Sequence, residues 1–139
     1  MPTHFSERCG AIEECYEFML AYAGQGLASD EGSQAGSQVR EFLGRAAQAM
    51  TGLAQSCTES AEEAGLESAG KHKAFIAVLE RDARDSLAAL DLVLAQPAIS
   101  SQLIDNLNAS IHLRALLTDL FLFDEILKAQ HKSKPAVTG

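Results

Sequence analysis

The 139-residue sequence contains no tryptophan, only three prolines and three cysteines, and aromatic residues make up just 6% of it. Three widely spaced cysteines do not suit a disulfide framework, so we expect free thiols and a reducing compartment, the cytoplasm. No apolar run approaches the roughly 20 residues that a membrane-spanning helix needs. The first ten residues lack a basic stretch followed by an apolar one, so they do not resemble a signal peptide.

Positive charge is also scarce. Eleven Lys and Arg residues stand against nineteen Asp and Glu residues, so the formal net charge is −8. Proteins that bind nucleic acids or anionic membranes need a basic surface, and we therefore expect neither kind of partner. Apolar residues make up 47% of the chain, which is enough for one hydrophobic core. We predict a single domain that spans residues 1–139.

Apolar residues recur at intervals of three and four, which is the spacing of amphipathic helices. Breaks rich in Gly and Ser, together with Pro97, divide the chain into segments of helical pattern that cover about 6–23, 38–64, 69–96 and 100–130. Consecutive helices with this spacing pack with coiled-coil-like contacts. The sequence therefore predicts an all-α protein, an antiparallel up-down-up-down four-helix bundle.

Two stretches outside these segments are polar. Residues 24–37 are rich in Gly and Ser and short of apolar side chains, so we expect a flexible linker there. Residues 131–139 are polar and locally basic, which is typical of a frayed tail.

The fourth segment is apolar on almost all sides between Ile111 and Leu127. One arc suits the bundle core and contains Leu103, Leu107, Leu117 and Phe121. A second arc contains Leu113, Leu116, Leu120, Phe123 and Leu127. A peripheral bundle helix needs only one apolar stripe. We therefore predict that the second arc, with Phe18 on the flank of the first helix, meets another chain, either in a homodimer or in a complex with another protein.

Two charges interrupt the apolar stripes of the third and fourth segments. If these segments are antiparallel helices joined by a tight turn near Ala98, Asp82 lies opposite Arg114. An isolated buried charge is costly, and a facing opposite charge is the usual remedy. We predict a shielded Asp82–Arg114 salt bridge whose role is to set the register of the two helices.

Standard motifs for metals and cofactors are missing from the sequence. No Glu is followed by His at the third position, and the chain has neither H-x-x-x-H nor C-x-x-C. These spacings place ligands on one side of a helix or turn, which is what metal binding needs. We expect no metal and no cofactor.

One acidic motif leads to an alternative. Glu13, Glu14 and Glu17 form E-E-x-x-E, which resembles the first metal-binding helix of the all-α nucleoside-triphosphate pyrophosphatases. In that family a second helix supplies E-x-x-D, and the acids together hold Mg²⁺ against a polyphosphate. No Glu in this chain has Asp at the third position. The resemblance implies an Mg²⁺-dependent hydrolase, whereas helical spacing explains these residues as a solvated face.

We therefore predict a small cytoplasmic helical-bundle protein that acts through protein–protein contacts, as an interaction, adaptor or regulatory module. The pyrophosphatase-like hydrolase is the alternative, and whether the protein is an enzyme stays open.

Overall fold

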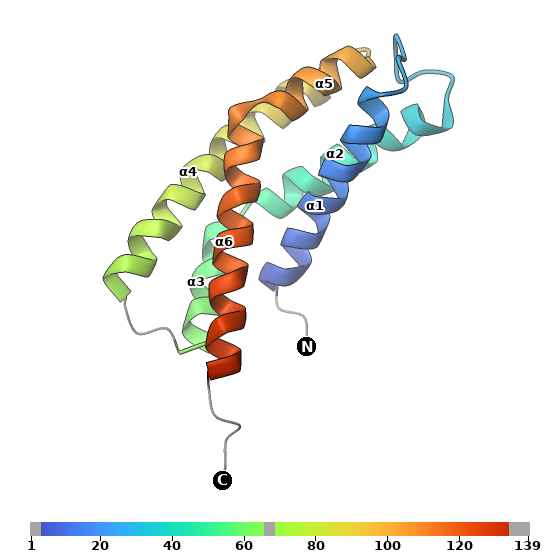
Figure 1. Ribbon diagram of the computed structural model, residues 1–139. Coiled ribbons are helices and arrows are strands. Elements are labelled where there is room, and N and C mark those ends of the chain that lie inside the picture. Colours follow the sequence, from blue (N-terminus) through green and yellow to red (C-terminus); the bar gives the residue numbers. More distant parts are fainter. Residues whose placement is uncertain (1–3, 66–68, 134–139) are drawn as a thin grey trace.

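The computed structural model describes residues 4–65 and 69–133, and within these ranges the chain is entirely α-helical apart from its connections (Figure 1). The helices are α1 (His4–Ala23), α2 (Gln34–Met50), α3 (Leu53–Glu63), α4 (Ala69–Leu94), α5 (Ser101–Ala109) and α6 (Ile111–Ser133). None of these helices is long and apolar enough to cross a membrane. The all-α prediction is confirmed. The predicted tail begins inside α6, and its last residues, 134–139, lie outside the described ranges.

The described residues form six helices where the sequence led us to expect four. The predicted first and third helices agree with α1 and α4 to within two residues at each end. The predicted second helix is divided into α2 and α3, and the predicted fourth into α5 and α6 (Figure 1). Both divisions have a local cause in the backbone.

The chain turns between α2 and α3 at Thr51 and Gly52. Thr51 is extended, and Gly52 has a left-handed backbone with φ of +79°, a conformation that disfavours any residue with a Cβ atom. Arg8 of α1 caps the end of α2, because its Nη1 donates to the carbonyls of Gln48, Ala49 and Thr51. These carbonyls have no partner inside the helix, and a cation is favoured at this end of the helix dipole.

The second break lies at Ser110, where φ is −63° and ψ is 137°. Its N–H ends α5 by donating to the Leu107 carbonyl at 3.0 Å, and its carbonyl begins α6 by accepting from the Arg114 N–H at 3.4 Å. One extended residue between two helices changes the helical phase, because each helical residue advances the direction of its side chain by about 100°. The core-facing side of α5 therefore does not continue as the core-facing side of α6.

The helices pack around one core. Helix α1 lies against α2 and α5, and α4 lies beside α6 and also contacts α2 and α3 (Figure 1). The largest fully buried side chains come from all these helices and from the α4–α5 connection: Phe5, Ile12, Met19, Tyr22, Leu43, Leu53, Leu79, Leu90, Ile99, Ile104, Leu113 and Phe123.

Hydrogen bonds tie the segment after α1 to the start of α5. The N–H of Leu27 donates to Oγ of Ser101, and the N–H of Ser101 donates to the carbonyl of Leu27, both at 2.8 Å. The Ser101 hydroxyl also donates to the Tyr22 carbonyl at 2.6 Å. Of the predicted flexible linker over 24–37, residues 34–37 belong to α2. The remainder makes polar contacts that composition alone did not reveal.

A carboxylate and a guanidinium extend this tie. Asp30 accepts from the N–H of Ile99 and from Nε of Arg40, both at 2.8 Å. Arg40 on α2 also donates to the carbonyls of Leu94 and Gln96 at the end of α4. The Ile99 N–H and the Arg40 guanidinium hold the pKa of the Asp30 carboxyl below its usual range. The Asp30–Arg40 ion pair thus connects the segment after α1, helix α2 and the α4–α5 connection.

The first turn of α2 requires a glycine next to Asp30. Ser33 caps α2 by accepting from the N–H of Gly36 at 2.9 Å. A Cβ atom on Gly36 would lie 1.9 Å from the carbonyl oxygen of Asp30. The close approach of the linker to α2 therefore depends on the missing side chain at position 36.

We expect Asp30→Ala to reduce the free energy of unfolding by about 1–3 kcal/mol, because it leaves the half-buried guanidinium of Arg40 without its carboxylate. The stabilisation by Asp30 is complete at neutral pH and is lost as the pH falls below about 4, since its pKa is lowered in the folded state. Urea unfolding and limited proteolysis measure the effect, with faster cleavage expected within residues 24–33. Asp91→Ala, an exposed acid on α4, is the control. Equal behaviour of the two variants would show that the tie does not stabilise the fold.

Candidate functional site

The arc predicted to be an interface lies in the core of the chain. Its five members on α6 are at most 8% exposed: Leu113, Leu116, Leu120, Phe123 and Leu127. Other helices of the same chain already cover these side chains, so they are not available to a partner. The interface prediction is wrong for these residues.

The cause of this error is the break at Ser110. A single helical phase drawn from Leu103 to Phe121 assumes one unbroken helix. The extended backbone at Ser110 rotates α6 relative to α5, and Phe121, which the sequence placed in the core, is 55% exposed. Leu107 and Leu117 of the same arc are buried as expected.

Phe18, the remaining residue of the predicted interface, joins α1 to α2. Its ring stacks on Phe42 with centroids 4.4 Å apart and lies 6.0 Å from the ring of Tyr22. Phe18 is half-buried by these contacts, which belong to the core of the chain. The structure does not bring it together with the exposed residues of α6.

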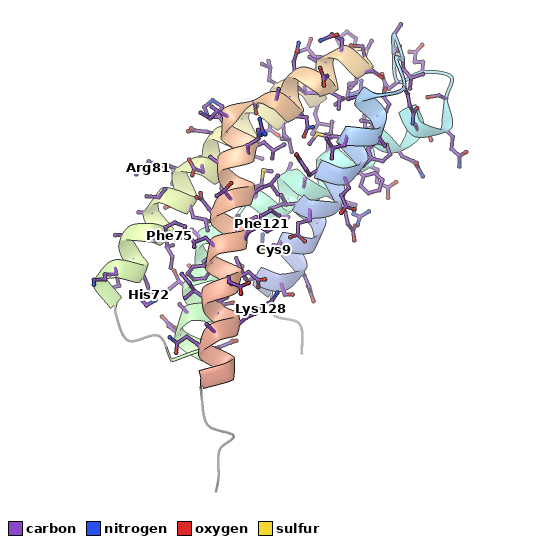
Figure 2. All side chains as sticks on the ribbon, in the orientation of Figure 1. Cys9, His72, Phe75, Arg81, Phe121 and Lys128 are labelled. Carbon is purple, nitrogen blue, oxygen red and sulfur yellow. The ribbon has the colours of Figure 1, made fainter. Side chains whose placement is uncertain are left out.

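A different set of apolar residues is exposed on α6 and on the neighbouring part of α4. Val78, Leu122 and Ile126 are 37%, 50% and 36% exposed, and we call them the α6 face. Phe121 is 55% exposed and lies on the other flank of α6, beside α1 (Figure 2 labels Phe121). The sequence contained a signal for this face, because α6 is apolar almost all round. Spacing alone did not tell which of its sides is covered.

The other large exposed apolar residues are Leu20, Leu92 and Ile111. Leu20 and Leu92 lie near the ends of α1 and α4, and Ile111 begins α6. They are therefore separate from the α6 face, which lies along the later turns of α6.

A groove of about 250 Å³ lies between α1 and α6, beside Phe121. Its polar lining includes Cys9, Glu13 and Asp124. Burial, together with the neighbouring Asp124, raises the pKa of the Glu13 carboxyl, and Lys128 opposes this rise. Lys128 itself pairs with Asp124 at 3.1 Å. Burial also raises the pKa of the Cys9 thiol well above its usual range, so the thiol stays protonated at neutral pH and is a poor nucleophile.

The three acids of the E-E-x-x-E motif do not meet at one point. Glu14 pairs with Arg45 of α2 at 3.0 Å, and both side chains are about half exposed. Glu13 faces α6, and Glu17 is exposed. Within the described ranges, no group of three or more His, Cys, Asp or Glu side chains is placed to hold a metal ion. The pyrophosphatase alternative therefore gains no support from these residues.

The predicted salt bridge between α4 and α6 is absent from the described part of the chain. Asp82 and Arg114 are not among its ion pairs, and Arg114 is exposed. Asp82 meets the carboxyl of Asp119 instead. Arg114 and Asp119 are five residues apart on α6, so their side chains diverge by about 140° around the helix axis. Asp119, and not Arg114, is therefore the residue of α6 that Asp82 meets.

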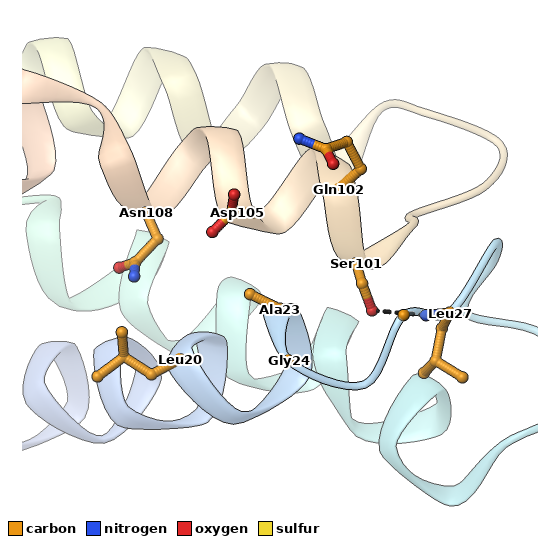
Figure 3. Close-up of a pocket in the computed structure, with 9 residues that line it drawn as sticks. Leu20, Ala23, Gly24, Leu27, Ser101, Gln102, Asp105 and Asn108 are labelled. Carbon is orange, nitrogen blue, oxygen red and sulfur yellow. Dashed lines mark hydrogen bonds between the residues drawn. The ribbon is translucent and has the colours of Figure 1, made fainter.

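A groove of about 520 Å³ runs between the end of α1 and α5 (Figure 3). One side is apolar and includes Leu20 and Leu27, and the other carries Asp105 and Asn108. Asn108 points toward Leu20 in Figure 3, and its Oδ1 is buried without a hydrogen-bond partner. The sequence gave no indication of this groove, because its two sides come from segments almost 80 residues apart.

No protein-family model, no curated protein and no solved structure matches this chain. Its function is therefore inferred from its own residues.

Because Leu116 lies in the core and not at an interface, a charge at this position should unfold the protein. Leu116→Glu places a charge at a position with 0% exposure, so we expect a loss of several kcal/mol and of most helical circular dichroism at 25 °C. Phe121→Glu, five residues later on α6 and exposed, is the matched control and should fold normally. If Leu116→Glu gives a folded protein of unchanged stability, the burial of this side of α6 is incorrect.

Proposed function

We propose that the chain is a small protein-interaction module, of adaptor or regulatory type, and that it forms a homodimer through the α6 face. The observation that supports this is the grouping of Val78, Leu122 and Ile126 on adjoining turns, all of them at least one-third exposed. Contiguous exposed apolar residues are typical of contact surfaces, whereas single ones are common on any protein. Covering each side chain would contribute roughly half of the 1.5–3 kcal/mol of a full burial.

A second copy is the occupant that the charges favour. Arg81 follows Val78 by one turn of α4, and Glu125 follows Leu122 by one turn of α6, and both are exposed (Figure 2 labels Arg81). The α6 face is thus bordered by both signs of charge, although the whole chain carries −8. A two-fold dimer places the same patch against itself, and a patch with both signs can match itself in this way. A strongly basic partner would instead be favoured by a border that carries only negative charges.

The cytoplasm remains the compartment we propose for this module. Cys9, Cys15 and Cys57 are free thiols, and burial raises the pKa of Cys15 and Cys57 to about 12. Reduced, protonated thiols suit a reducing compartment. For the architecture, we propose a four-element helical bundle. Two of its elements are the single helices α1 and α4, and the other two are the interrupted helices formed by α2 with α3 and by α5 with α6.

Leu122→Glu should convert the dimer into a folded monomer, because it places a charge in the centre of the apolar contact. Sedimentation velocity at high micromolar concentration measures the association. Circular dichroism and thermal melting check that the fold is unchanged, with stability expected within about 0.5 kcal/mol of the natural protein.

Leu92→Glu is the matched control, since Leu92 is 66% exposed on α4 but lies outside the α6 face. It should leave the dimer intact. A natural protein that is monomeric at high micromolar concentration would refute the homodimer. Loss of association in both variants would show that the contact is elsewhere.

A further inference from the structure

Two carboxyl groups meet between α4 and α6. Asp82 lies on α4 between Phe75 and Asp85, and Asp119 lies on α6 between His112 and Phe123. The rings of Phe75 and Phe123 are 6.3 Å apart on one side of the two acids. On the other side, Nδ1 of His112 lies 3.9 Å from the carboxylate of Asp85. These two contacts bracket Asp82 and Asp119 at the same level of the α4–α6 interface.

The contact between the two acids requires a proton. Ionised carboxylates only accept hydrogen bonds, so two of them in contact repel each other, whereas one protonated carboxyl donates to its neighbour. Oδ2 of Asp119 is buried, and no N–H or hydroxyl group of the described residues donates to it. The carboxyl of Asp82 is the group that meets Asp119. The two carboxyl groups can therefore form a hydrogen bond when the pair holds one proton.

Within residues 4–65 and 69–133, no ion pair joins a cation to these two acids. On α6, Arg114 is exposed, and His112 is engaged with Asp85. On α4, Arg81 is exposed next to Asp82. Three other acids of the surrounding helices face other neighbours: Glu80 pairs with Arg84 beside α3, Glu13 of α1 faces Asp124, and Asp105 of α5 lines the groove with α1.

Burial and the neighbouring Asp82 together raise the pKa of the Asp119 carboxyl to about 7. In the unfolded chain an aspartate titrates near 3.9. The folded state therefore keeps a proton that the unfolded state has lost between about pH 4 and pH 7, and stability falls as the pH rises through this range. Above about pH 7 the Asp119 carboxyl loses this proton and the contact becomes repulsive.

The acids also adjoin the α6 face. Val78 precedes Asp82 by four residues on α4, and Leu122 follows Asp119 by three residues on α6. Each spacing is one helical turn, so the two acids and these two apolar residues lie along the same interface between the helices. A change in the spacing of α4 and α6 at the acids is therefore transmitted to the α6 face.

We infer that Asp82 and Asp119 share one proton and form a pH-sensitive contact between α4 and α6, which holds the α6 face together at acidic pH and loosens it above neutrality. The proton is exchanged with water, and no other group is consumed or formed. The effect on the α6 face rests on the proposed function, whereas the shared proton does not.

The shared proton is tested by thermal melting of the full chain between pH 5 and pH 8.5. The melting temperature of the natural protein should fall by roughly 5 °C over this range. In Asp119→Asn the side-chain amide donates the hydrogen bond at every pH and does not have to bind a proton from water. Most of the fall should therefore disappear, and the variant should melt at a higher temperature than the natural protein at pH 8.

Two control variants keep this test specific. Asp91→Asn removes an exposed acid from α4 and should retain the fall in melting temperature. His112→Gln should retain it too, although histidine side chains change charge in the same pH range. The inference is overturned if Asp119→Asn retains the full fall, or if His112→Gln abolishes it.

A direct titration does not depend on any variant. Carboxyl carbon chemical shifts of the natural protein, followed by NMR, should show Asp119 titrating near neutrality. A midpoint in the ordinary range of aspartate, near pH 4, would refute the shared proton.

Sedimentation at pH 6 and pH 8 separates this inference from the proposed function. We expect the dimer dissociation constant to rise about tenfold at pH 8, which is the effect of one pKa unit, and to stay constant in Asp119→Asn. If Asp119 titrates near neutrality and no dimer forms at either pH, the proposed function fails and the shared proton stands. If the dimer forms with equal affinity at both pH values, the link between the carboxyl pair and the α6 face is refuted.

Discussion

The extended backbone at Ser110 determines which side of α6 faces the core, and much of the remaining structure depends on it. Helix α5 packs against α1 through one set of side chains, and α6 starts again with a different phase. As a result Leu116 and Leu120 are covered, whereas Phe121 and Leu122 reach the surface. The same rotation brings Asp119 to α4. The buried arc, the exposed apolar face and the carboxyl pair are thus three consequences of one backbone conformation.

Two arginines stabilise the carboxyl ends of helices. Arg8 donates to the last carbonyls of α2, and Arg40 donates to carbonyls at the end of α4. Every helix has four carbonyls at this end without partners inside the helix. A guanidinium with its several donors satisfies more than one of them and adds a favourable charge. Division into short helices creates more such ends, and side chains from neighbouring helices compensate for them.

The carboxyl pair has the opposite energetic character. Arg8 and Arg40 stabilise the fold at neutral pH, whereas Asp82 and Asp119 oppose it once both are ionised. A cation at either position would remove this cost, yet Arg81, next to Asp82 in α4, and Arg114 of α6 are both exposed. Strongly perturbed titratable groups are concentrated at functional sites, and here the perturbed group borders the exposed apolar face.

The sequence by itself determined the all-α class and the extents of α1 and α4, because helical periodicity is a local property that neighbouring residues express directly. It also showed that the residues of α6 are apolar on nearly every side. Which of those sides is buried was decided only by the tertiary structure, since a helix that is apolar all round satisfies more than one packing arrangement. The partner of Asp82 was likewise beyond the sequence. It depends on the register of α4 and α6, and that register depends on the shape of the 95–100 connection, which Asp30 and Tyr22 hold through hydrogen bonds to Ile99 from far along the chain.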